Sequence, residues 1–213
     1  TTLAVDTEAS VTVDTSKVEG DGVINANEVK DGVTLTGTTE PGSSVSVTMN
    51  GVARNATVDA SGNWSADFLP SDIPSGETTV GVSVTATDQF GNTASATDTV
   101  KVDTLVNRLN STMNTVEGDG VVNAAEASDG LTLTGQVEAG STVNVTFGKT
   151  GKSYSATVSP TGDWSVDIPA GEIPKGEYTA NMVVSAQDAA GNVDSVNESF
   201  IIDTTAPNSP VIE

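Results

Sequence analysis

The residues of this sequence best suited to chemistry are carboxylates, and they are concentrated in the segment from 19 to 28. Compared with the calcium loop of an EF-hand, D-x-[DN]-x-[DN]-G-x5-E, Asp21 takes the fifth position, Gly22 the glycine position and Glu28 the bidentate twelfth. The first position holds Lys17, so a first ligand would have to come from another segment. The spacing therefore predicts a Ca2+ site whose ligands in this loop are Glu19, Asp21, the carbonyl of Val23 and Glu28.

The same loop occurs a second time, with an offset of 98 residues between Glu19 and Glu117. Its expected ligands are Glu117, Asp119, the carbonyl of Val121 and Glu126. The alternative interpretation is an Asp-Gly turn followed by one helical turn, with the glutamate as a cap. We favour Ca2+ because hard oxygen ligands gather here in both copies, but the sequence leaves both interpretations open.

A second set of acids recurs where the two copies join. Asp103 lies in the sequence Val-Asp-Thr, and similar neighbours surround Asp6 near the start and Asp203 near the end. If the strands run up and down, the loops that carry Glu138 and residues 188–192 lie at the end of the second copy that the chain enters from Asp103. Carboxylates that converge at a short linker repel one another unless a cation lies between them, so the pattern favours a metal here. The alternative is that Asp-Thr begins a turn and the acids face solvent.

The whole chain is a duplication. Gly62-Asn63-Trp64-Ser65 returns as Gly162-Asp163-Trp164-Ser165 at an offset of 100, because the turn Asn50-Gly51 becomes the longer 148–151. A chain of 213 residues holds two such domains comfortably. We expect one repeat over residues 1–103, a second over 104–203, and the start of a linker to a following repeat in 204–213. The abrupt start of the chain also indicates an excerpt of a longer protein.

Short runs of alternating apolar and polar residues fill each copy. The longest places Val80, Val82, Val84 and Ala86 at every second position, which is the period of a strand with one buried face. Strands are predicted near 10–14, 32–38, 44–49, 52–58, 64–68, 77–87 and 93–102, with equivalents in the second copy. The predicted fold class is all-β, with two tandem immunoglobulin-like antiparallel β-sandwiches in an extended arrangement.

The amino-acid composition excludes several classes of function. The chain has 8 Lys+Arg against 29 Asp+Glu, a formal net charge of −21, which opposes binding to nucleic acid or to anionic membranes. It contains no cysteine and no histidine, so the available metal ligands are oxygens, which suit Ca2+ or Mg2+. No apolar segment is long enough to span a bilayer, and we expect no direct membrane insertion.

Two other functions fit less well. A pair of catalytic carboxylates of the glycosidase type is compatible with the number of acids, but each candidate recurs at a turn of both copies, which indicates a structural role. We therefore predict no catalytic residue and no enzyme activity. The main alternative is a carbohydrate- or surface-binding module with Trp64 and Trp164 as sugar platforms. Each ring, however, opens a strand in which it alternates with Ala66 or Val166, which predicts that it faces the core.

The motifs Gly-Asn-Trp-Ser, Asp-x-x-Gly-Asn and Val/Ile-Asp-Thr-Thr-Ala-Pro together resemble the tandem bacterial immunoglobulin-like extender repeats of giant RTX-type surface adhesins, which include biofilm-associated and ice-binding adhesins. The resemblance covers essentially the whole chain. It implies a stalk rigidified by Ca2+, type I secretion, and a spacer that holds a binding head away from the bacterial cell surface. We expect an extracellular monomer whose partners are neighbouring repeats of the same chain.

The resemblance also implies a role for individual acids. By motif match the linker acids are Asp6, Asp103 and Asp203, and the loop acids are Asp88 and Asp188. The first junction departs from the family pattern, because Leu and Val follow Asp103-Thr104 where the pattern has Thr-Ala-Pro. With Glu138, these five residues are the candidate metal ligands outside the two acidic loops.

Overall fold

The computed structural model describes residues 5–207, so the end of the predicted linker, residues 208–213, lies outside the described residues. The chain divides into two compact units, Thr1–Leu105 and Val106–Glu213, and each is described on its own. Among the described residues, no helix is long and apolar enough to cross a membrane.

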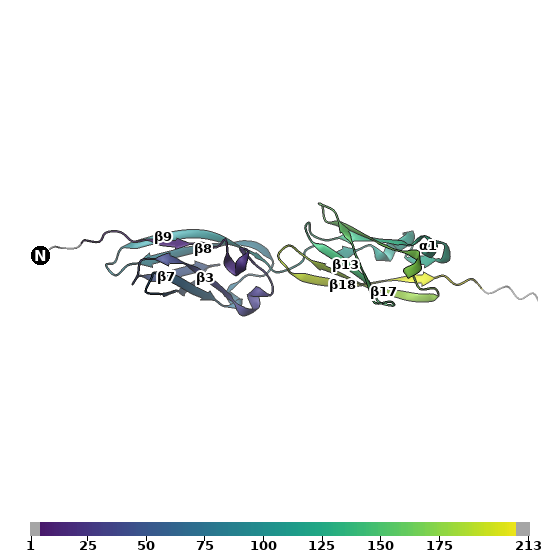
Figure 1. Ribbon diagram of the computed structural model, residues 1–213, viewed down its shortest axis with the longest axis horizontal. Helices are drawn as coiled ribbons and strands as arrows, with labels where there is room; N and C mark the ends of the chain where they lie inside the picture. The colour runs from purple at the N-terminus through teal and green to yellow at the C-terminus, as the bar shows by residue number, and fades with distance from the viewer. Residues whose placement is uncertain (1–4, 208–213) are drawn as a thin grey trace, which may run out of the picture. The chain divides into compact units, whose positions relative to one another are not determined.

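The first unit is a sandwich of two β-sheets (Figure 1). One sheet has the strand order β1-β3-β7-β6 and the other the order β2-β9-β8-β4-β5. The strands are β1 Val11–Val13, β2 Val23–Ile24, β3 Val33–Thr39, β4 Ser44–Met49, β5 Val52–Asn55, β6 Thr57–Val58, β7 Asn63–Phe68, β8 Glu77–Thr87 and β9 Thr93–Asp103, and the 3-10 helices are η1 Val18–Gly20, η2 Glu28–Asp31 and η3 Pro70–Asp72. These orders match the A-B-E-D and G-F-C sheets of an immunoglobulin domain.

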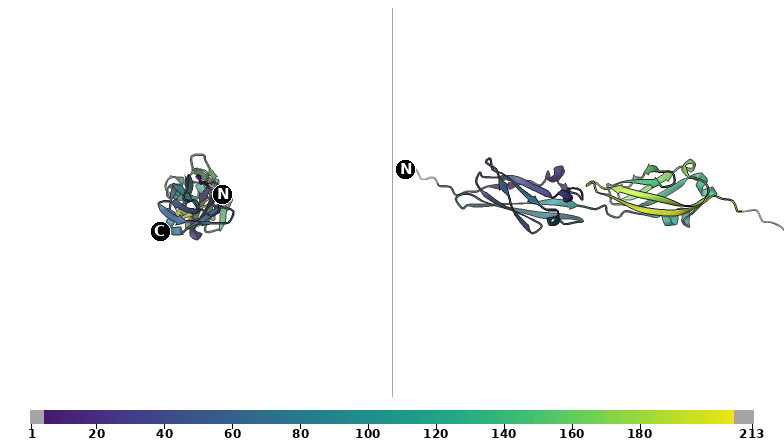
Figure 2. Two further views of the ribbon diagram at one scale, coloured as in Figure 1. Left: turned by 90° about the vertical axis from the view of Figure 1, so that its left-hand side faces the viewer. Right: turned by 90° about the horizontal axis from the view of Figure 1, so that it is seen from below.

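The second unit repeats this topology, with the orders β10-β12-β16-β15 and β11-β18-β17-β13-β14. Its strands are β10 Asn110–Ser111, β11 Val121–Asn123, β12 Leu131–Gln136, β13 Thr142–Phe147, β14 Lys152–Ser155, β15 Thr157–Val158, β16 Asp163–Ile168, β17 Glu177–Gln187 and β18 Val193–Asp203, and its helices are η4 Met113–Gly118, α1 Ala124–Asp129 and η5 Ala170–Glu172. The right-hand view of Figure 2 shows the strands of each unit from a further direction. The predicted all-β class with two immunoglobulin-like sandwiches is confirmed.

The period-two alternation forms the core of each sandwich. In β8, Val80, Val82, Val84 and Ala86 are buried, while the residues between them face outward. The strand pairs with β9 over its whole length, from Glu77 opposite Asp103 to Thr87 opposite Thr93. This long hairpin places the β8–β9 turn at one end of the sandwich and the exit of the chain at the other.

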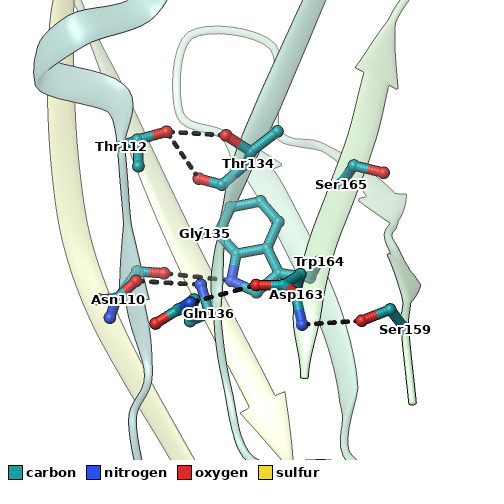
Figure 3. A pocket seen from close by; sticks show the side chains of 9 residues that line it. All are labelled: Asn110, Thr112, Thr134, Gly135, Gln136, Ser159, Asp163, Trp164 and Ser165. Carbon is teal, nitrogen blue, oxygen red and sulfur yellow. Dashed lines mark hydrogen bonds between the residues drawn. The ribbon is translucent and has the colours of Figure 1, made fainter. Parts of the chain in front are cut away.

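Both tryptophans are core residues, as predicted. Trp64 and Trp164 are each 1% exposed. The indole N–H of Trp164 donates to the carbonyl of Asn110 at 3.1 Å (Figure 3), and that of Trp64 donates to the carbonyl of Thr12 at 3.0 Å. Gly135, paired with Trp164, is needed here because a Cβ would lie 2.6 Å from the ring. Neither ring therefore offers a face to a sugar.

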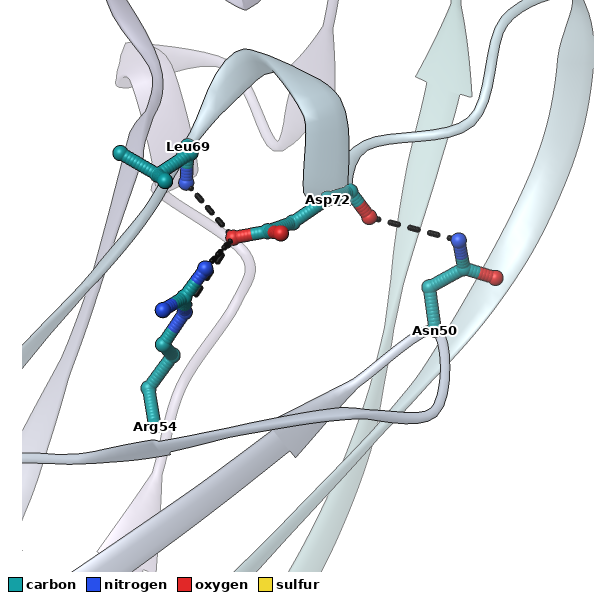
Figure 4. A network of polar contacts seen from close by, with 4 residues as sticks. All are labelled: Asn50, Arg54, Leu69 and Asp72. Atoms are coloured by element: carbon teal, nitrogen blue, oxygen red, sulfur yellow. Dashed lines mark hydrogen bonds and ion pairs between the residues drawn. The ribbon is translucent and has the colours of Figure 1, made fainter.

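The exit end of the first unit is held by a polar cluster (Figure 4). Arg54, on β5, forms an ion pair with the carboxylate of Asp72 in η3, which also accepts the N–H of Leu69 at 2.9 Å. The side chain of Asn50, in the β4–β5 turn, donates to the carbonyl of Asp72 at 3.3 Å. The cluster ties the β4–β5 hairpin to the segment between β7 and β8.

Two details differ from the expected strands. The predicted strand 52–58 is two strands, because β5 pairs with β4 in one sheet while β6 pairs with β7 in the other. In addition, the middle of the first acidic loop forms β2, which pairs in parallel with β9. The sandwich is therefore antiparallel except at this one edge of the first unit, and the same parallel pairing joins β11 to β18 in the second.

Candidate metal centre

Three carboxylates meet at the entry end of the first unit. Asp6 lies on the segment that enters the sandwich, Glu40 follows β3, and Asp88 follows β8. One carboxylate oxygen from each lies within 4.8 Å of the others. Asp88 is buried, Glu40 half-buried and Asp6 exposed. The up-and-down strand order, which predicts one shared end for the equivalent loops of the second copy, applies to the first copy as well, and the structure brings these three segments together.

The Asp-x-x-Gly-Asn motif fixes the position of Asp88. One oxygen of its carboxylate accepts the N–H groups of Phe90 and Asn92, both at 2.8 Å, and the other accepts the side-chain amide of Asn92 at 2.7 Å. Gly91 completes the turn with φ of 93°. The side chain of Asn92 also donates to the carbonyl of Asp6 at 3.3 Å, which joins the turn to the entering segment.

The hydrogen bonds around Asp88 favour its ionised form. Burial raises the pKa of Asp88, but the hydrogen bonds from Asn92 and Phe90 outweigh this effect and leave the pKa below its ordinary value. The ion pairs Arg54–Asp72 and Lys152–Glu172 lie elsewhere in the described residues, and neither includes a member of this group. Three negative groups within a few ångströms repel one another, and a cation between them would remove that repulsion.

The donor set fits Ca2+. It consists of carboxylate oxygens from three separate segments, with the backbone carbonyl of Asp6 on the same segment, and the chain has neither histidine nor cysteine to offer nitrogen or sulfur. Ca2+ takes six to eight oxygen ligands in flexible geometry, whereas Mg2+ demands a near-ideal octahedron. Glu40 was missed in the sequence; the signal was its offset of 98 residues from Glu138.

The second unit carries the equivalent loop acids. Glu138 follows β12, and its carboxylate accepts the N–H of Asn107 at 3.0 Å. Asp188 follows β17 and is bound by Asn192 as Asp88 is by Asn92, at 2.8 Å to the N–H and 2.7 Å to the side-chain amide. In the repeat, Asp103, Glu138 and Asp188 correspond to Asp6, Glu40 and Asp88.

The other two linker acids end long strands. Asp103 is the last residue of β9, opposite Glu77, and Asp203 is the last residue of β18, opposite Glu177. The carboxylate of Asp203 accepts the hydroxyl of Thr205 at 2.7 Å and its N–H at 3.0 Å, and these hydrogen bonds lower the pKa of Asp203. The chain leaves each sandwich with an acid at the same position.

The first acidic loop has the geometry of the alternative interpretation. Asp21 accepts the N–H of Val23 at 2.9 Å. Glu28 accepts the N–H of Asn25 at 2.8 Å, while the side chain of Asn25 accepts the N–H of Glu28 at 3.2 Å, which is a reciprocal pair of hydrogen bonds in the turn that leads into η2. Burial, and then the charge of Glu28, raises the pKa of Glu19.

The second acidic loop has the same contacts. Asp119 accepts the N–H of Val121 at 2.9 Å, and Glu126 forms the reciprocal cap with Asn123 that begins α1. Within residues 5–207, the groups of three carboxylates close enough to hold an ion include none from either loop. Ca2+ binding by these loops stays a prediction.

Comparisons with known proteins agree with the fold. The family described as "Bacterial Ig domain" matches residues 24–103, and that described as "Bacterial Ig-like domain" matches residues 110–204. No curated protein matches the chain.

Solved structures give closer relatives. A Ca2+-stabilised adhesin with which an Antarctic bacterium reaches out and binds ice is 33% identical over 95% of this chain and 51% of that one, with a TM-score of 0.57. A 1.5-MDa bacterial ice-binding adhesin is 29% identical over 95% of this chain and 67% of that one, with a TM-score of 0.59. The chain thus spans about half the length of the first of these structures. It belongs to the bacterial immunoglobulin-like domain family and contains two of these domains in tandem.

Proposed function

We propose that this chain is a spacer segment of a bacterial surface adhesin, in which Ca2+ fixes each repeat to the segment that enters it. The observation that carries the proposal is the group Asp6–Glu40–Asp88 at the entry end of the first sandwich. The similarity to a Ca2+-stabilised adhesin over 95% of the chain supports it.

A cation at this place acts on the linker rather than on the core. Asp6 belongs to the entering segment, whereas Glu40 and Asp88 belong to loops of the sandwich. Without a cation their charges repel and favour release of the segment; with Ca2+ between them the segment is cross-linked to the sandwich. Contacts between consecutive domains are otherwise small and permit motion.

The repeat extends the proposal along the chain. Asp103, Glu138 and Asp188 stand where Asp6, Glu40 and Asp88 stand one repeat earlier, so we propose that they bind the second Ca2+. Asp203 would supply the linker ligand for a following repeat. A stalk built this way gains stiffness at each junction as Ca2+ binds.

The acidic loops are proposed as weaker cation sites. Their backbone contacts already satisfy one oxygen each of Asp21 and Glu28, so a cation would share carboxylates that have a structural role. Burial and the charge of Glu28 raise the pKa of Glu19, so a nearby positive charge would stabilise the ionised form of Glu19. This supports a cation at the loop. The proposed ligands are those predicted from the sequence, in both loops.

The setting follows from the same role. We propose an extracellular position at the bacterial cell surface and neighbouring repeats as the partners, with no nucleic-acid or membrane contact. The formal net charge of −21 supports the absence of nucleic-acid and membrane contact, since it opposes binding to anionic surfaces.

Calorimetric titration of the whole chain with Ca2+ and with Mg2+ tests the proposal. We expect the parent to bind Ca2+ clearly more tightly than Mg2+, and Glu138→Gln to weaken one site at least about tenfold, because a neutral amide replaces a charged ligand. The matched control is Asp129→Asn, which removes one charge from an exposed position at the end of α1. A parent that binds no Ca2+, or equal losses in both variants, would contradict the proposed site.

A further inference from the structure

An apolar hollow opens at the exit end of the second unit. Its volume is about 360 Å3, and it lies between α1, η5 and the segment that leaves the sandwich at Thr204. Ala127 and Ile173 are buried at its base, and Lys175 adds an exposed side chain. The hollow is large enough for one aromatic side chain.

The side chains of the second repeat make this hollow. Three of its lining positions carry a valine, a lysine or a proline in the first repeat, at the offsets of 98 and 100 that relate the two copies. The replaced pairs are Val29 by Ala127, Lys30 by Ser128, and Pro70 by Ala170. Two alanines and a serine thus replace a valine, a lysine and a proline, and the six-residue helix α1 replaces the four-residue 3-10 helix η2, so both the side chains and the local backbone differ here.

The entry end of the first unit carries an exposed aromatic side chain whose size fits such a hollow. Phe90, in the β8–β9 turn of the first unit, is 65% exposed, and the second unit has Ala190 in its place. The turn is rigid, because the N–H of Phe90 and that of Asn92 both donate to Asp88. An aromatic ring held outward on an ordered turn retains apolar surface that a partner can cover.

We propose that the hollow of the second unit receives Phe90 of a second copy of this chain, in a head-to-tail contact. The ring would bury its apolar surface on Ala127, Ala170 and Ile173. The charges also match in the form without Ca2+, since Phe90 adjoins the acidic Asp6–Glu40–Asp88 group and the hollow carries Lys175 at its rim. A contact between different surfaces at the two ends continues from copy to copy, as in an array.

The place where the chain leaves the second unit would strengthen a weak contact at the hollow. Residue Thr204 lines the hollow and is also where the chain leaves the unit. In an array in which one copy of this chain follows another, the first repeat of the next copy is tethered beside the hollow. Such a tether supplies an effective concentration in the millimolar range. The contact goes beyond the Ca2+ role, because neither the ring nor the hollow needs a cation.

Cysteine cross-linking between two whole chains tests the proposal, since the chain has no cysteine of its own. One variant carries Gln89→Cys beside the ring and the other Ser128→Cys at the hollow; they are mixed in a glutathione buffer and the mixed disulfide is measured. We expect the mixed disulfide to form about tenfold faster than when Phe90→Ala is added to the first variant. Phe90 is exposed, so this change leaves the fold intact.

A second variant fills the hollow instead of removing the ring of Phe90. Ala127→Val with Ala170→Pro installs the first repeat's own residues, and we expect the same loss of cross-linking. Mixed-disulfide rates that are equal with and without Phe90, or no mixed disulfide above that of a Gln89→Cys partner with cysteine at exposed Asp129, would overturn the proposal. The assay is run in Ca2+ and in chelator: loss only in chelator would tie the contact to the cation site, whereas failure in both leaves the Ca2+ proposal standing.

Discussion

Two aspartates show how this chain uses single carboxylates. Asp88 is held by the N–H groups of its own turn, so that its charge is positioned for a cation. Asp72 is held by Arg54 and by the N–H of Leu69, so that its charge is already neutralised within the unit. The same residue type is thus a candidate ligand at the entry end and a structural anchor at the exit end.

The Arg54–Asp72 pair should stabilise the first unit at neutral pH but not in acid. The hydrogen bonds from Arg54 and Leu69 lower the pKa of Asp72, so the fold favours its ionised form. This contribution is complete above the unfolded-chain pKa of about 3.9 and is lost as pH falls through the lower pKa of the folded state. Arg54→Met should therefore lower the melting temperature at pH 7 and change it much less at pH 2. An equal loss at both pH values would show that Arg54 acts by packing alone.

At the scale of elements, the close approach of strands depends on glycine beneath each tryptophan. A Cβ at Gly37 would lie 2.1 Å from the carbonyl oxygen of Thr12 and 2.5 Å from Cζ2 of Trp64. Gly81, on β8, has no atom within 4 Å of the same position. Comparing the two glycines thus distinguishes a position where a Cβ would clash from one where glycine only adds conformational freedom to the chain.

We predict opposite effects of alanine at these positions. Gly37→Ala should destabilise the first unit by roughly 1–3 kcal/mol, since the ring or the strand must move. Gly81→Ala should be neutral or stabilise by up to about 1 kcal/mol, because it reduces the freedom of the unfolded chain. Chemical denaturation followed by circular dichroism measures both, and a harmless Gly37→Ala would show that β1 and β3 can separate without cost.

The elements were predictable where burial repeats along a strand. The alternation from Val80 to Ala86 predicts β8, because a strand with one buried face buries every second side chain. The strand β2 was not predictable, since two residues set no period and their partner β9 lies far along the chain. Asp21 and Glu28 were ambiguous because a calcium ligand and a reciprocal cap use the same carboxylates at nearly the same spacing.

The candidate site was predictable only in part. Asp88 was indicated by its motif and Asp6 by the recurrence of Asp-Thr, but the residue that completes the group, Glu40, stands in an ordinary Glu-Pro-Gly turn. Its role depends on the strand order, which brings the ends of β3 and β8 together in space although they lie in different sheets. Proximity of this kind follows from the fold rather than from local sequence.

For the whole molecule, we propose that Ca2+ at the linker acids sets the stiffness of the chain. Asp103 and Asp203 have equivalent positions at the ends of β9 and β18, but only Asp103 is followed by a second sandwich within this chain. The two acids therefore form a matched pair: each variant removes the same charge from the same structural position, and only one of them alters a junction.

Small-angle X-ray scattering of the parent, Asp103→Ala and Asp203→Ala, each in Ca2+ and in chelator, measures this stiffness. We predict a sharply defined maximum dimension for the parent in Ca2+ and a broad distribution in chelator, because the linker is released. Asp203→Ala should behave as the parent, and Asp103→Ala should stay broad in Ca2+ while both sandwiches keep their circular dichroism. A parent whose scattering is the same with and without Ca2+, or an Asp103→Ala variant that stiffens as the parent does, would contradict the account.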